Sequence, residues 1–261
     1  MKNVPAERLT READLSMRFR MMFREIEAHV LDLVLMGYTV STIPDAQWLA
    51  IEEQIWREIA PSLRNSAFMT AAEVSLAHGL SSSKYLENLT GRDVETAGRQ
   101  MAHRFTNRIR INAQKTVEHQ QAADISLYFI LSQYFNQLEE DEDLFESVGI
   151  TGTTIAESRG RHSVATHLRE IIGERGVRRL DVPSEYIHEQ GEELIDADDI
   201  DDPDDIRYEV VEVWEIEDAD ACPVCQELDG ETDELWGEEY PGGPPAHPNC
   251  RCRTRIMYRR I

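Results

Sequence analysis

The four cysteines of the chain lie in two short stretches, CPVC at 222–225 and HPNCRC at 247–252. Cysteines clustered in this way indicate a metal site, a pair of disulfides or a redox site. The two stretches share one spacing: two residues separate Cys222 from Cys225, and two residues separate His247 from Cys250. His247 thus takes the place of a first cysteine in the second stretch. The spacing therefore predicts that the chain folds back on itself and brings the two stretches together.

A zinc site is the main prediction from this spacing. Two thiolates separated by two residues can turn onto one ion, while backbone amides of the turn point at the sulfur atoms. In a strand, side chains two residues apart point to the same side, so Cys252 is expected to point to the same side as Cys250. Cys252 could therefore replace His247 or Cys250 as a ligand. The five candidates are Cys222, Cys225, His247, Cys250 and Cys252. The spacing predicts zinc but leaves open which four of these bind it.

Two other readings of the cysteines are weaker. Disulfides, for example Cys222 with Cys252 and Cys225 with Cys250, require an oxidising compartment. The first residues of the chain lack the apolar region of a signal peptide, so we expect folding in a cytoplasm. A redox C-x2-C site would be expected in a thioredoxin-like βαβ context, which the sequence does not show.

The zinc is expected to be structural. A catalytic zinc keeps one position open for water and has a base nearby, and Glu227, Glu231 or Asp233 could serve as that base. Three or more thiolates make the ion electron-rich and a poor activator of water. In the loop between the two stretches, Trp236 and Tyr240 are expected to anchor the module, with partner binding as the alternative.

The first two-thirds of the chain has the apolar periodicity of helices. We expect one helix from Asp14 to Gly37, a second from Pro44 that Pro61 closes, and a third that ends at Gly79. Two successive helices are expected within 91–148, and one further helix within 151–176.

Strand patterns appear only after residue 205. The segments 207–216 and 250–261 alternate in the manner of strands, and we expect them to pair antiparallel with arginines opposite glutamates. The predicted fold class is mainly α with a small C-terminal antiparallel β zinc-knuckle module (α+β). The predicted domains are a helical domain over 1–188, an acidic linker or exposed loop over 189–206, and the zinc module over 207–261.

Charge limits the classes of partner. The chain has 50 acidic and 27 basic residues, a formal charge of -23, and only three lysines. Such a chain repels nucleic acid at long range, so DNA binding over the whole surface is not expected. The segment 189–206 holds ten acids but lacks the central Gly and closing Glu of a calcium loop. The sequence has no apolar run of about 18 residues, so no membrane span is expected.

The segment 207–256 resembles the phage Mu F-like minor head proteins, also called the head morphogenesis family of tailed viruses. The resemblance rests on DADACPVCQELDGE and PPAHPNCRCRTRI. The stretch 153–171 is similar to the helix that precedes the strand in the family, although Glu157, Ser158 and Arg159 stand in place of the family's Arg-Thr-Glu run. Residues 1–150 match only in being helical.

The resemblance implies a structural minor capsid protein rather than an enzyme. Its expected partners are the portal and the major capsid protein, and its expected place is the capsid interior or portal vertex, after assembly in the host cytoplasm. The arginine-rich C-terminus is expected to pair with the acidic strand, with contact to packaged DNA as the alternative. The alternative function is a zinc-dependent hydrolase or nuclease acting on DNA or cell wall.

Overall fold

The computed structural model describes residues 4–81, 83–120, 125–173, 177–178, 182–188, 207–217 and 221–261. The fold is mainly helical with a small C-terminal antiparallel sheet, which confirms the predicted fold class. The predicted acidic linker, 189–206, lies outside the described residues. Among the helices that the structure describes, none is long and apolar enough to cross a membrane.

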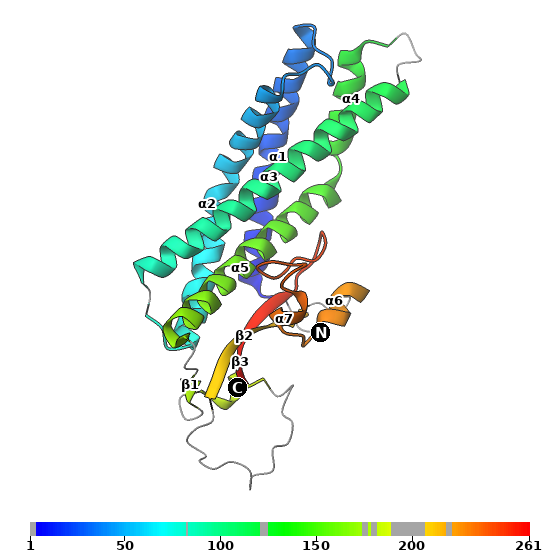
Figure 1. Ribbon diagram of the computed structural model, residues 1–261. Helices are drawn as coiled ribbons and strands as arrows, with labels where there is room; N and C mark the ends of the chain where they lie inside the picture. The colour runs from blue at the N-terminus through cyan, green and yellow to red at the C-terminus, as the bar shows by residue number, and fades with distance from the viewer. Residues whose placement is uncertain are drawn as a thin grey trace. The chain divides into compact units, whose positions relative to one another are not determined.

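Five long helices precede the sheet (Figure 1). They are α1 (Ala6–Leu35), α2 (Asp45–Ala77), α3 (Lys84–Gln120), α4 (Leu127–Glu139) and α5 (Glu142–Ile172). The strands are β1 (Val177–Arg178), β2 (Arg207–Glu215) and β3 (Arg253–Arg260). Three short elements, η3 (Ser184–Tyr186), α6 (Pro223–Leu228) and α7 (Asp233–Trp236), complete the described fold.

The predicted helix end at Pro61 is wrong, because Pro61 lies inside α2. A proline within a helix costs about 3 kcal/mol through its missing N–H and its ring. Ile59 and Leu63, on either side of it, are both fully buried. Each such side chain contributes about 1.5–3 kcal/mol when buried, so their packing outweighs the proline. The predicted second and third helices are therefore one helix.

Other helix boundaries also differ from the prediction. Helix α1 begins at Ala6, before the expected start at Asp14. The expected break within 91–148 exists, since α3 ends at Gln120 and α4 begins at Leu127. However, α5 begins at Glu142 and continues through 151, so the last predicted helix starts earlier than the apolar pattern indicated.

The chain forms two compact units. One, the sheet unit, comprises 67–93 and 157–261, and the other, the helical unit, comprises 4–66 and 94–156. Three long helices thus contribute residues to both units. Residues 207–261, the predicted zinc module, share the sheet unit with segments of the long helices.

Aromatic side chains form the core of the helical unit. The rings of Phe19 and Phe105 lie 5.0 Å apart, and Phe23 lies 5.6 Å from both Phe135 and Phe145. These rings come from four helices, and edge-to-face packing, as in the Phe19–Phe105 and Phe23–Phe145 pairs, adds about 0.5–1.5 kcal/mol per pair beyond burial.

The sheet has the strand order β1-β2-β3, and both pairs are antiparallel. Glu209 lies opposite Arg259 and Glu215 opposite Arg253, which confirms the predicted pairing of acids with arginines. The Arg253 guanidinium donates to the Glu215 carboxylate at 2.6 Å. Cross-strand pairs of opposite charge therefore help to set the register between β2 and β3.

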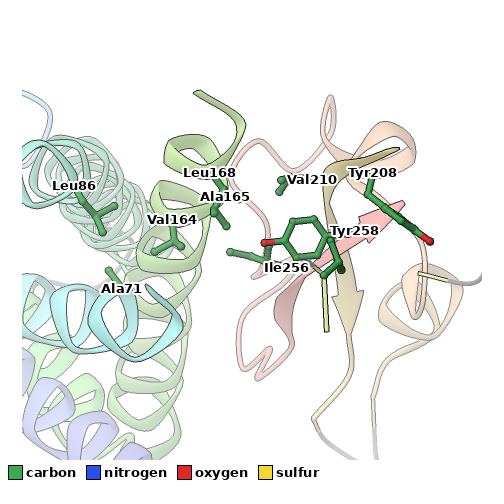
Figure 2. Close-up of a cluster of buried hydrophobic side chains, with 10 residues drawn as sticks. Ala71, Leu86, Val164, Ala165, Leu168, Tyr208, Val210, Ile256 and Tyr258 are labelled. Carbon is green, nitrogen blue, oxygen red and sulfur yellow. The ribbon is translucent and has the colours of Figure 1, made fainter. Parts of the chain in front are cut away.

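One face of the sheet packs against α5 (Figure 2). Alternate residues of a strand share a face, so Tyr208 and Val210 point to the same side as Ile256 and Tyr258 of the neighbouring strand. They form one core with helical side chains that include Ala71, Leu86, Val164, Ala165 and Leu168. This core fixes β2 and β3 on the helix, and the cysteine stretches adjoin these two strands.

Candidate metal centre

The first cysteine stretch is the start of helix α6. The Cys222 sulfur caps this helix and accepts a hydrogen bond from the Cys225 backbone N–H at 3.4 Å. Pro223 occupies the first turn, where a helix tolerates proline because that N–H has no partner within the helix. The helical turn brings the Cys225 side chain back toward Cys222, and an N–H directed at sulfur offsets thiolate charge.

The second stretch is a tight turn before β3. The Cys250 N–H donates to the His247 carbonyl at 3.2 Å, and Asn249 within the turn has a φ of 65°. Asparagine adopts this left-handed conformation more readily than most residues. The Cys225 sulfur approaches both residues at the ends of this turn, His247 through its Nε2 and Cys250 through its sulfur.

All five predicted ligand residues converge. Their ligating atoms form two groups, Cys222–Cys225–His247 and Cys225–Cys250–Cys252, and within each group the atoms lie within 4.8 Å of one another. Cys225 belongs to both groups. All four cysteines are free, so the structure does not show the alternative disulfide pairing. The cluster could hold a metal ion.

The distances agree with a tetrahedral zinc site. Zinc binds sulfur at about 2.3 Å and imidazole nitrogen at about 2.0 Å, which places two sulfur ligands about 3.8 Å apart and a sulfur and a nitrogen about 3.6 Å apart. The Cys225 and Cys250 sulfurs are 3.7 Å apart, and the Cys225 sulfur is 3.4 Å from His247 Nε2. Both distances are thus close to the edge lengths of a coordination tetrahedron.

The His247 ring is oriented for coordination. Its Nδ1 lies 2.6 Å from the Pro248 carbonyl oxygen. A carbonyl only accepts, so Nδ1 carries the proton and Nε2, which faces Cys225, presents its lone pair. Metal-binding histidines are commonly fixed by such a hydrogen bond from the second ring nitrogen.

Hydrogen bonds among the thiols distribute their protons unequally. Those from Cys225 and Cys252 lower the pKa of Cys250. The hydrogen bond with Cys250, followed by that with Cys252, raises the pKa of Cys225. The cluster thus favours one thiolate surrounded by thiols. A metal ion would displace the remaining protons, because zinc binds cysteine as thiolate.

Aromatic rings enclose the cysteines. Trp214 of β2 and Trp236 of α7 are buried in the same cluster as Cys225, Cys250 and Cys252. Trp214 packs edge-on against Trp236 and Tyr240 at 5.5 and 5.6 Å. The expected anchoring role of Trp236 and Tyr240 is thereby confirmed.

The loop between α7 and the second knuckle lies against α5. Gly242 and Gly243 have φ values of 86° and 80°, which side chains rarely adopt. A Cβ at Gly242 would collide with the Arg159 guanidinium of α5, and one at Gly243 would lie 2.8 Å from Thr254 Cγ2. Shortly before His247, Gly242 thus lets the loop approach α5 closely, and Gly243 lets it approach Thr254 of β3.

A buried ionic network joins α5 to β2, and the sequence did not predict it. The acids of β2 were expected on an exposed face, but Glu212 is 1% exposed and lies 2.9 Å from His162 Nδ1. Arg169 donates to Glu212 at 3.2 Å and to Asp233 at 2.7 Å. Burial raises the pKa of Glu212, but His162 and Arg169 outweigh it, so that this pKa is lowered overall. The sequence contained one indication that Glu212 is buried: it lies two residues before Trp214, so alternation puts it on the same, apolar face of the strand.

The three comparisons with known proteins were uniformly negative. No family model, curated protein or solved structure matches the chain. The resemblance described above therefore rests on the motifs within 207–256.

Proposed function

We propose that the cluster holds one zinc ion with a structural role, and that the chain is a minor head protein of a tailed virus. The observation that carries the proposal is the convergence of Cys222, Cys225, His247, Cys250 and Cys252 at zinc-like spacing. The same residues form the motifs that resemble the head morphogenesis family.

Zinc suits this donor set best. Thiolate and imidazole ligands in a tetrahedral arrangement favour zinc over calcium or magnesium, which prefer oxygen. Cys225, Cys250 and Cys252 are buried, and five candidates exceed the four that a closed site needs. Closed, thiolate-rich zinc sites are structural, since they leave no position for water.

The placement of the candidate bases also favours a structural role. The Asp233 carboxylate accepts hydrogen bonds from Arg169 and from the Glu212 backbone N–H at 2.9 Å. Glu227 is exposed on α6. Asp233 is thus occupied in joining α5 to β2, which argues against the hydrolase or nuclease alternative.

In this role the metal adds to the small hydrophobic core that includes Trp214 and Trp236. The segment from α6 to the second knuckle has only short helices, and a bound zinc would join it to the start of β3. Structural zinc supplies folding free energy directly, with apparent values of about 10–16 kcal/mol in zinc-finger peptides.

Native mass spectrometry of the intact chain tests the metal. We expect a mass excess of one zinc that chelator removes and that reductant leaves in place. A metal-free chain four hydrogens lighter than its sequence would show two disulfides instead, and the zinc proposal would fail.

Co-expression tests the head-protein role. The chain would be produced with the portal and major capsid proteins encoded in the same genome, and the assembled particles would be sedimented. We expect the chain to sediment with them at low copy number, at the capsid interior or portal vertex. Particles that form normally without any bound chain would contradict the proposal.

A further inference from the structure

One helical segment has the opposite charge from the rest of the chain. Residues 96–117 contain no acid and five basic residues, in a chain whose formal charge is -23. The five are Arg99, Arg104, Arg108, Arg110 and Lys115. All lie on α3, within the helical unit.

Two of these five are already neutralised. Arg99 pairs with Glu53 at 2.7 Å and with Glu95 at 3.0 Å, and Arg110 pairs with Asp45 at 2.9 Å. The other three, which we name the α3 basic face, are Arg104, Arg108 and Lys115. All three are exposed, and none makes an ion pair with any residue that the structure describes.

The α3 basic face is a straight row. At 100° per residue, positions 104, 108 and 115 fall within an arc of about 40°, and at 1.5 Å per residue they span about 16 Å along the helix. Ile111, which is 49% exposed, lies in the same row.

The neighbouring helices α2 and α4 do not cancel the charge of the row, and Glu118, three residues after Lys115, is the nearest acid on α3 itself. Helix α4 packs beside α3, where the Tyr134 hydroxyl donates to the Ile109 carbonyl at 3.3 Å, and residues 127–138 of α4 carry no charge. On α2, Asp45 and Glu52 are bound by Arg110 and His103. At physiological salt the Debye length is about 8 Å, so more distant acids are largely screened.

We propose that the α3 basic face binds the backbone phosphates of a nucleic acid without reading its sequence. Regularly spaced phosphates along a stiff strand match a straight row of cations. A flexible acidic peptide would offer no fixed spacing. The proposal goes beyond the structural zinc function and does not depend on the metal.

The proposal also places the DNA contact away from the C-terminal arginines, which were expected to pair with the acidic strand and to contact DNA only as the alternative. Arg253 pairs with Glu215 and Glu217, and Arg259 pairs with Glu209 and Glu234. Those guanidinium groups would have to leave their carboxylates to reach phosphate. The residues of the α3 basic face make no such ion pair with any described residue, so they can reach phosphate without leaving a carboxylate.

Fluorescence anisotropy with a labelled 20-base-pair duplex at 50 mM salt tests the proposal. The variant R104Q/R108Q/K115Q removes the row from an exposed helix surface, and circular dichroism would verify its helicity. The control R57Q/R64Q/R92Q removes three arginines that are paired with Glu53, Glu95 and Asp93. Both variants change the net charge equally.

We expect the first variant to bind the duplex at least tenfold more weakly and the control to stay within twofold of the wild type. Three phosphate contacts predict that log K falls with log salt at a slope of about -2.7, and the first variant should lose most of this slope. The proposal is overturned by absence of wild-type binding, or by equal losses in both variants. Tighter, row-dependent binding of poly-glutamate than of DNA would also overturn it, in favour of an acidic protein partner.

Discussion

The sulfur atoms of Cys225 and Cys250 lie 3.7 Å apart, although 25 positions separate the two residues. Helix α6 delivers the first and the turn before β3 delivers the second. Cys225 is also the residue shared by both groups of ligand atoms. Cys225 is therefore the one candidate whose sulfur lies within 4.8 Å of every other ligand atom in both groups.

Cys225→Ser should abolish stoichiometric zinc binding. A hydroxyl is a poor zinc ligand, so the variant should lose part of the folding free energy that zinc supplies. That free energy is about 10–16 kcal/mol in zinc-finger peptides, and a typical domain is stable by only about 5–15 kcal/mol, so even a partial loss is large. We expect early proteolysis within 207–261, detected by limited digestion and mass spectrometry. Val224→Ser, at the adjacent exposed position, is the matched control and should keep its zinc. Retention of one zinc per Cys225→Ser chain would refute the central role of this residue.

The convergence of the cysteines could be predicted because ligand spacing is a local property. The alternation in 207–216 and 250–261 likewise predicted the β2–β3 pair, and the charges predicted Glu209 opposite Arg259. Each of these patterns depends on residues close together in sequence or directly opposite in a strand pair.

Features that depend on tertiary packing could not be predicted in this way. Pro61 normally ends a helix, but the buried Ile59 and Leu63 hold α2 together across it. Glu212 looks like one more acid of an exposed strand face, yet it meets His162 and Arg169 from α5. Neither partner is near in sequence, and only the packing of α5 on the sheet brings them together.

Trp214→Ala should destabilise the sheet unit strongly. The Trp214 side chain is completely buried between the cysteines and two other aromatic rings, and removing such a side chain typically costs about 3–5 kcal/mol. Urea denaturation followed by near-UV circular dichroism would measure the change. Leu235→Ala on α7 is the control, because Leu235 is 64% exposed and should change stability by less than about 0.5 kcal/mol. Equal midpoints for the two variants would show that Trp214 is not an anchor.

Gly242→Ala should cost more than Gly37→Ala. Both glycines have positive φ, for which a side chain costs about 1–2 kcal/mol. A Cβ at Gly37 meets nothing within 4 Å, whereas one at Gly242 meets the Arg159 guanidinium, so only Gly242→Ala also forces that guanidinium to leave its place against the loop. Thermal unfolding would compare the two, and a chelator competition would show faster zinc loss from Gly242→Ala alone. If both variants lose equal stability and hold zinc equally, the loop does not depend on its contact with α5.

The contribution of the His162–Glu212 pair should depend on pH. The hydrogen bond with Glu212 raises the pKa of His162, despite the opposing effect of burial. Stability from His162 is therefore full below its unfolded pKa of about 6.5 and is lost as pH rises through the higher folded value. The lowered pKa of Glu212 acts in the other direction, since its contribution is lost only as pH falls below about 4.5 toward the folded value.

His162→Gln should consequently destabilise the protein more at pH 5.5 than at pH 8.5. A hydrogen bond to a charged group contributes about 1.5–3 kcal/mol, and the neutral imidazole keeps only part of it. Urea midpoints of variant and wild type at the two pH values would give the difference. His103→Gln is the matched control, because His103 also lies 2.9 Å from a carboxylate, that of Glu52, but is exposed to solvent. We expect little change from it at either pH. A loss for His162→Gln that is the same at both pH values would mean that the imidazole acts by packing rather than by charge.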